Sequence, residues 1–224
     1  MSIQREILVG TAWVAAARWG IRGLGVVSTM VLARLLVPDD FGLVALATIP
    51  AVILGLLLKD FFEAAFAAPV FAGGLLILTA LLLVVAERFG SRSRALESLT
   101  WLDALIVGCW QAAAILPGIS RSGATISGAV LRDFNRPDAA RFSFLMSIPA
   151  LLGAGVVALT DLLASGTLVE QLPAIIVGFG TAAVAGYLCI RWLLHYLQRH
   201  SLYIFAVYCV ALSLLTLAVA LIRS

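Results

Sequence analysis

Long apolar runs, each about as long as a bilayer crossing, constrain this chain more than any other feature of its sequence. Residues 69–87, 172–194 and 202–222 each carry at most one charged side chain. The hydrocarbon core of a bilayer is about 30 Å thick, and a helix needs roughly 20 residues to cross it. Backbone groups in lipid must find partners within their own segment, so such runs predict helices. We therefore expect an all-α, polytopic transmembrane protein.

The composition supports this class. Of the 224 residues, 62% are hydrophobic and 12% are charged, and the mean hydropathy of +1.10 lies outside the range of soluble domains. The positive charge comes from fourteen arginines and one lysine, mostly in short connections. That distribution is typical of membrane topology rather than of nucleic-acid binding. The three cysteines lie within apolar runs without metal-ligand spacing, so neither a disulfide framework nor a metal site is predicted.

The order of the apolar segments predicts the helices. Beyond the first turn-forming sequence, Pro38-Asp39-Asp40, we expect spans at about 41–58, 69–87, 101–116, 142–163, 172–194 and 202–222. The first 48 residues are different, because three arginines interrupt two candidate segments at 7–25 and 26–37. An amphipathic or pore-facing helix pair fits those segments better than a lipid-exposed one. The three arginines are Arg18, Arg22 and Arg34.

The sequence LPGISRSGAT, residues 116–125, interrupts this pattern. Residues 119–131 are too short to cross a bilayer alone, because about 13 residues at 1.5 Å each span about 20 Å. Pro117 and Gly118 precede them and break a helix. We therefore expect two half-helices, 101–116 and 119–131, that form a broken or re-entrant pair inside the protein.

The connecting charges predict a topology. Positive residues occur in 88–100, in 132–141 and around 191–199, whereas 164–171 has none. We expect all positive connections to fall on one side if 119–131 completes a crossing that 101–116 begins. By the positive-inside rule that side is cytoplasmic, so the 117–125 segment opens toward the outer face. If 119–131 instead returns to the side from which it came, the parity breaks and the later positive connections are expected to face outward.

The residues of the break predict an anion-binding site. A helix that begins after Gly118 points free N–H groups at the break, and its dipole favours an anion there. Arg121 adds a cation whose donors match phosphate oxygens, and Ser120, Ser122 and Thr125 add hydroxyls. The alternative is close helix packing through small residues, with hydroxyls bonded to nearby backbone. A charge at this depth costs at least a few kcal/mol and favours the functional interpretation.

Two further side chains lie within spans near the break. Gln111 is predicted either to line the cavity or to hydrogen-bond between helices. Trp110 packs either against a lipid chain or against a neighbouring helix. The nearest carboxylates lie mostly at helix ends and are predicted to be solvated caps or ion-pair partners. They are Glu63, Glu87, Glu97, Asp103, Asp133 and Asp138.

The run PGISRSGATISGAVLRDFNRPDAARFSFLMSIPALLGAG closely resembles the second signature of bacterial undecaprenyl-diphosphate phosphatases of the bacitracin-resistance type, and the likeness covers about 49–224. The resemblance implies an inner-membrane enzyme that removes the terminal phosphate of a C55 isoprenyl diphosphate and recycles the lipid carrier of peptidoglycan synthesis. Arg121 would grip the diphosphate, and Ser120 and Thr125 would hydrogen-bond its oxygens. Ser122 with Gly123 would shape the loop. Gly118 and Gln111, which the break and the span position mark, are predicted with them as substrate-binding residues. The family also implies Mg²⁺ or Ca²⁺, for which this chain offers no identifiable ligands, and a homo-oligomer is left open.

The chain also departs from that family. Its members have two inverted halves, and the first half carries a glutamate-rich stretch of the form EGxxEFLPVSSTGH. Residues 1–62 here contain one glutamate, Glu6, and no histidine. Residues 1–48, and ARLLVPDDFGLVALA in particular, instead resemble the first helices of a polysaccharide or lipid-linked oligosaccharide flippase. The alternative functions are therefore a non-catalytic binder or transporter of polyprenyl phosphates, or an inactive fused fragment.

Overall fold

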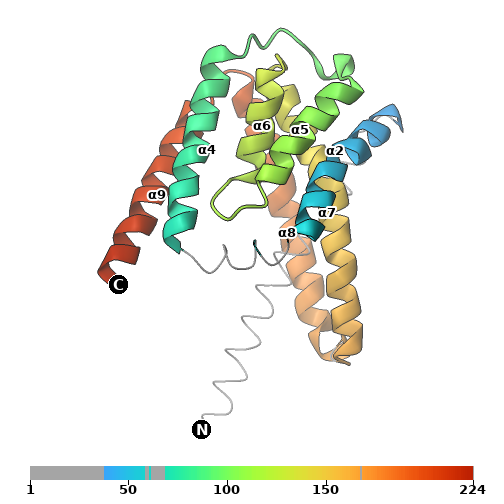
Figure 1. Ribbon diagram of the computed structural model, residues 1–224. Coiled ribbons are helices and arrows are strands. Elements are labelled where there is room, and N and C mark those ends of the chain that lie inside the picture. The colour runs from blue at the N-terminus through green and yellow to red at the C-terminus, as the bar shows by residue number, and fades with distance from the viewer. Residues whose placement is uncertain (1–37, 59–60, 62–68, 167, 224) are drawn as a thin grey trace. The chain divides into compact units, whose positions relative to one another are not determined.

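The protein is an all-α chain, as predicted. A computed structural model describes residues 38–58, 61, 69–166 and 168–223 (Figure 1). Its elements are α2 (Pro38–Leu57), α4 (Pro69–Phe89), the 3-10 turn η1 (Leu96–Ser98), α5 (Trp101–Ala113), α6 (Arg121–Leu131), α7 (Arg136–Ala164), α8 (Leu168–Leu197) and α9 (Tyr203–Arg223). The expected segments 7–25 and 26–37, with their three arginines, and Glu63 lie outside the described residues.

Four helices in the described ranges are long and apolar enough to cross a membrane. They are Val70–Phe89, Arg136–Ala164, Gln171–Leu197 and Tyr203–Ile222. The sequence and the structure therefore both indicate a multi-pass membrane protein.

The start of α7 differs from its predicted position at 142. The helix begins at Arg136 because Asn135 and Asp138 cap it reciprocally: the Asp138 N–H donates to Asn135 Oδ1 at 3.0 Å, and Asn135 Nδ2 donates to Asp138 Oδ2 at 2.8 Å. Pro137 is tolerated in the first turn, where its missing N–H leaves no broken bond.

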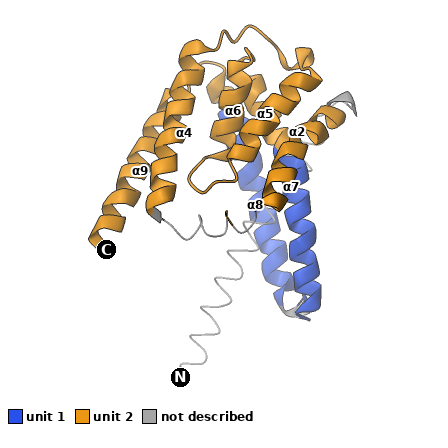
Figure 2. Cartoon of the chain, in the orientation of Figure 1, with its two compact units in different colours: residues 1–36, 147–193 blue, residues 37–146, 194–224 orange. Residues whose placement is uncertain are grey.

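The chain divides into two compact units (Figure 2). Unit 1 contains, among the described residues, the parts of α7 and α8 within 147–193, joined by a turn in which Gly166 has a φ of +67°. Unit 2 contains 37–146 and 194–224. The candidate site lies entirely within unit 2.

Unit 2 is built around α4 and α5. Helix α4 packs against α9 and α6, and α5 packs against α2 and α6, so α9, α4, α6, α5 and α2 follow one another across Figure 1. Glycines permit the closest contacts: a Cβ on Gly108 would lie 2.4 Å from the Ala47 carbonyl oxygen, and one on Gly128 would lie 2.6 Å from the Trp110 ring. Trp110 therefore packs against a neighbouring helix, the second of its two predicted alternatives.

The pair α5–α6 is re-entrant, and it returns to the end from which it came. Arg132, just after α6, pairs through Nε with Asp103 Oδ1 at 2.7 Å, in the first turn of α5. The Arg94 N–H donates to the Asp133 carbonyl, and the Asn135 N–H donates to the Arg94 carbonyl, both at 2.9 Å. The broken pair is confirmed, but the expectation that 119–131 completes a crossing is wrong. The arginine-rich connections share one end because the pair returns, so the expectation that a returning pair would turn the later positive connections outward is wrong as well.

That shared end is held together by buried carboxylates. Glu87, at the end of α4, accepts bonds from Arg92 Nη1 at 2.6 Å, from Arg136, and from the Leu202 N–H at 3.1 Å. Its side chain is 4% exposed. The prediction of an ion-pair partner is correct for Glu87, whereas the solvated alternative is wrong.

Asp103 forms the second buried centre of this end. It accepts bonds from Arg94 Nη2 at 2.8 Å and from Arg132, and it forms a capping box with Thr100. The bond to Asp103 raises the pKa of Arg94, which lies in the connection before α5. Arg94 also lies over the Phe134 ring, with its Cζ 4.4 Å from the ring centroid. These contacts fix the open end of the α5–α6 pair.

Candidate functional site

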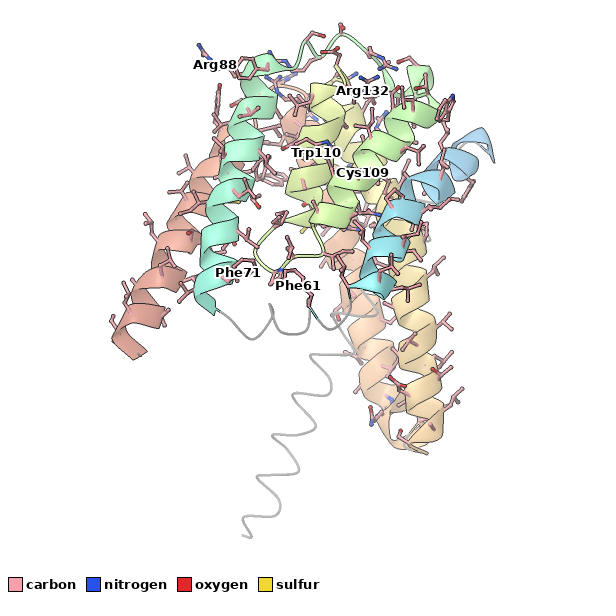
Figure 3. The ribbon with its side chains drawn as sticks, in the orientation of Figure 1. Phe61, Phe71, Arg88, Cys109, Trp110 and Arg132 are labelled. Carbon is pink, nitrogen blue, oxygen red and sulfur yellow. The ribbon has the colours of Figure 1, made fainter. Side chains whose placement is uncertain are left out.

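The break between α5 and α6 lies at the end of unit 2 opposite the arginine-rich connections. In Figure 3, Arg88 and Arg132 mark that end, whereas Phe71 marks the end of α4 beside the break. Gly118 has a φ of +94°, and a Cβ on it would lie 2.0 Å from the Ala72 carbonyl oxygen. Backbone approaches backbone here, so the position requires glycine.

Helix α6 begins at this break with a partly satisfied N-terminus. Ser120 is the N-cap, and its Oγ accepts a bond from the Gly123 N–H at 3.2 Å. The Ser120 N–H donates to Thr79 Oγ1 at 3.1 Å. Among the described contacts, the N–H groups of Arg121 and Ser122 have no acceptor. Two free donors therefore remain at the positive end of the helix dipole.

Arg121 differs from the other half-buried arginines of the described residues. Those others form ion pairs with carboxylates, whereas Arg121 has no ion pair or hydrogen bond from its guanidinium within the described ranges. The paired arginines are Arg92, Arg94, Arg132 and Arg136. An unpaired cation beside free N–H groups is a site prepared for an anion.

The predicted hydroxyl residues lie around this cation but already have partners. Ser120 Oγ and Ser122 Oγ are 3.4 Å apart. Thr125 is fully buried one turn further along, and its Oγ1 lies 2.8 Å from the Arg121 carbonyl and 2.6 Å from Ser143 Oγ of α7. The structure thus brings Gly118, Ser120–Gly123 and Thr125 to one turn, while their roles toward a ligand stay predictions.

Gln111 lies in α5 and is 4% exposed. Neither its Oε1 nor its Nε2 has a hydrogen-bond partner in the described structure, so the alternative of an interhelical bond is not realised there. An unsatisfied buried polar group costs about 1–3 kcal/mol. Gln111 is therefore a donor and acceptor that a bound ligand or water would satisfy, and its predicted role in substrate binding stays a prediction.

Sequence reasoning missed Thr79. It lies in the predicted 69–87 span as a single hydroxyl among apolar residues, and no local motif marks it. In the structure it is fully buried, and its Oγ1 donates toward the Gly118 carbonyl at 3.3 Å. Only the folded contact between α4 and the break identifies it.

Comparison with known proteins assigns the chain. Residues 22–215 match the family described as bacitracin resistance protein BacA. The chain belongs to this family. The resemblance stated from the PGISRSGAT sequence is thereby confirmed, and the match begins within the 1–48 segment. The predicted division between a flippase-like 1–48 and a second domain at 49–224 stays a prediction.

Named relatives agree with the family. An undecaprenyl-diphosphatase from Methanothermobacter thermautotrophicus is 45% identical over 183 residues, which are 80% of this chain and 100% of the relative. Relatives of the same name from Rubrobacter xylanophilus and Synechococcus sp. WH7803 are 45% and 42% identical over 80% and 77% of this chain. The chain spans only 66% and 62% of those two proteins.

In this member of the bacitracin-resistance family, the described residues around Arg121 do not form a suitable binding site for a divalent cation. They offer hydroxyls, backbone groups and the guanidinium but no carboxylate, and protein sites for Mg²⁺ and Ca²⁺ are usually built on carboxylates. The buried carboxylates Glu87 and Asp103 are paired with arginines at the other end of α5–α6. Within the ranges that the structure describes, no three His, Cys, Asp or Glu residues group as metal ligands.

The close approach at Gly118 predicts a stability effect. Gly118→Ala is expected to lower the free energy of unfolding by about 2–3 kcal/mol, because a positive φ and an overlap with Ala72 both oppose the new Cβ. Gly166→Ala is the matched control, since Gly166 also has a positive φ but nothing lies within 4 Å of the place that its Cβ would take. Its cost is expected to be about 1 kcal/mol. Equal losses in denaturant unfolding would show that the contact with Ala72 is unimportant.

Proposed function

We propose that this protein is an undecaprenyl-diphosphatase, which hydrolyses the terminal phosphate of a C55 isoprenyl diphosphate and so recycles the lipid carrier of cell-wall synthesis. Membership of the bacitracin-resistance family and the shared name of its relatives support this function. The observation that carries it is the half-buried Arg121 guanidinium, which is unpaired among the described residues and lies on the same turn as two N–H groups without a described acceptor. A diphosphate would supply the negative charge that the described residues do not place at this turn.

In this proposal Arg121 binds non-bridging diphosphate oxygens through its planar fork of donors. The N–H groups of Arg121 and Ser122 bind the same group at the positive end of α6. Donors fixed before the reaction stabilise the charge that develops during phosphoryl transfer. Ser120 and Thr125 keep their predicted contacts to the diphosphate oxygens, through hydroxyls that also hold the first turn of α6.

The proposed site opens toward the extracytoplasmic face of the inner membrane. The break lies opposite the connections that carry Arg88, Arg92, Arg94 and Arg132. The positive-inside rule assigns that arginine-rich end to the cytoplasm. A prenyl chain would then lie in the bilayer beside the apolar helices while its diphosphate enters from the outer side. A homo-oligomer in which a second copy adds groups to this site is compatible with the proposal.

The alternative is a non-catalytic binder or transporter of polyprenyl phosphates. The hydroxyls of Ser120 and Thr125 are bonded to the backbone of α6, and Thr125 also to Ser143. Those contacts favour a turn that holds an anion without attacking it. Binding and hydrolysis share the same cation, so only turnover separates the two functions.

The test is phosphate release from C55 and C15 prenyl diphosphates by the purified protein, with and without Mg²⁺ or Ca²⁺. We expect release in the presence of a divalent cation. No residue of this chain is proposed as a ligand of that cation. Tight binding without release would favour the non-catalytic alternative. Neither binding nor release would exclude both.

A further inference from the structure

Thr79 connects α4 to the turn that carries Arg121. We propose that Thr79 is a positioning residue, which fixes the break so that the N–H groups of Arg121 and Ser122 are the ones left free for an anion. This inference rests on the proposed function, because it concerns how the same turn binds its diphosphate.

The hydroxyl of Thr79 bonds to the break on both sides. It lies 3.3 Å from the Gly118 carbonyl oxygen, to which it donates, and it accepts the Ser120 N–H at 3.1 Å. A threonine hydroxyl has one hydrogen and two lone pairs, so it can do both at once. Its single hydrogen also has the Leu75 carbonyl of its own helix as an acceptor, likewise at 3.3 Å. In the described structure no other side chain bonds to the backbone of residues 118–120.

The methyl group of Thr79 contacts the first turn of α6. A Cβ built on Gly123 would lie 2.9 Å from Thr79 Cγ2, so the methyl group occupies the space that a larger residue would need. Thr79 is fully buried, so its hydroxyl and its methyl group are both fixed in position by their neighbours. A β-branched side chain has few rotamers, which makes it a rigid support.

These contacts decide which donors of α6 remain available. Four N–H groups at a helix start lack intrahelical acceptors. Thr79 uses that of Ser120, and the Ser120 hydroxyl uses that of Gly123. The remaining two belong to Arg121 and Ser122, the residue with the guanidinium and its neighbour. Thr79 thus centres the anion site on Arg121.

The decisive comparison is Thr79→Val against Thr79→Ser in the full-length protein. Valine keeps the shape but removes the hydroxyl, whereas serine keeps the hydroxyl. We expect Thr79→Val to raise the Kd for C15 prenyl diphosphate about tenfold, the effect of about one or two lost hydrogen bonds, and Thr79→Ser to recover most of the affinity. Thr48→Val is the control, because Thr48 is also buried but, within the described ranges, its hydroxyl bonds only to the Val44 carbonyl of its own helix.

A double-mutant cycle separates positioning from general stability. If Thr79 acts through the turn, Thr79→Val should cost less affinity in an Arg121→Ala background than in the wild type, because the two residues serve one site. Additive losses, or equal Kd values for Thr79→Val and the wild type, would overturn the inference while the proposed function stands. A wild type that neither binds nor hydrolyses prenyl diphosphate would remove both. Should Thr79→Val not fold, Thr79→Ala removes the same hydroxyl and takes its place.

Discussion

Arg121→Ala is expected to lower kcat/KM for prenyl diphosphate hydrolysis by about a thousandfold or more, the scale on which an arginine acts in phosphoryl transfer. The guanidinium is a cation of the break that has no partner in the described part of the chain, and alanine removes both its charge and its fork of donors. Its loss affects the transition state more than the ground state, because negative charge develops on the leaving phosphate as the bond to the terminal phosphate breaks. Steady-state phosphate release from C15 and C55 substrates measures the effect.

Two variants complete that experiment. Arg121→Lys keeps the charge but loses bidentate geometry, so it should recover only part of the rate. Arg88→Ala removes an exposed arginine at the opposite end and should leave kcat/KM within about twofold of the wild type, as for most surface substitutions. A similar loss in both alanine variants would mean that total positive charge matters and the turn does not.

Glu87→Gln is expected to lower the free energy of unfolding by about 3–5 kcal/mol, the usual cost of removing one partner from a buried ion pair. Glu87 is buried and joins Arg92, Arg136 and the backbone of Leu202. Glutamine leaves the two arginines without a countercharge. Its amide N–H group would also face hydrogen-bond donors, where the carboxylate offered an acceptor. The loss should appear in equilibrium unfolding of the detergent-solubilised protein.

Glu97→Gln provides the matched comparison, because Glu97 is exposed in η1. Its effect should stay within about 0.5 kcal/mol. If the two substitutions destabilised the protein equally, the buried centre at Glu87 would contribute nothing beyond an ordinary surface charge.

Much of the fold followed from local sequence signals. The spans predicted at 69–87, 172–194 and 202–222 correspond to α4, α8 and α9 because unbroken apolar runs specify membrane helices strongly. Pro117 and Gly118 located the break because their backbone constraints act on neighbouring residues alone. Helix α7 begins before the predicted 142, because the reciprocal caps of Asn135 and Asp138 start it ahead of the apolar run that marks the span.

The direction of the α5–α6 pair and the role of Thr79 depended on contacts between distant residues. Asp103 and Arg132 meet only because the pair folds back, and nothing in either local sequence requires it. Thr79 resembles any small polar residue of a membrane helix until α4 lies beside Gly118. The residues of the proposed anion-binding turn could be identified from the sequence, because an arginine is costly in an apolar chain, whereas the contacts that support the turn could not.

The backbone hydrogen bonds that join Arg94 to Asp133 and Asn135 hold the two ends of the segment 94–135 next to each other. The chain leaves the end of α4 and comes back to it before α7 begins, as the bonds of Glu87 to Arg92 and Arg136 also show. Because this segment begins and ends on the same side, it does not change the membrane topology. The spans before and after it would have the same orientation without it. The part of the chain that carries the Arg121 turn can therefore diverge in length and sequence without inverting the rest of the protein in its membrane.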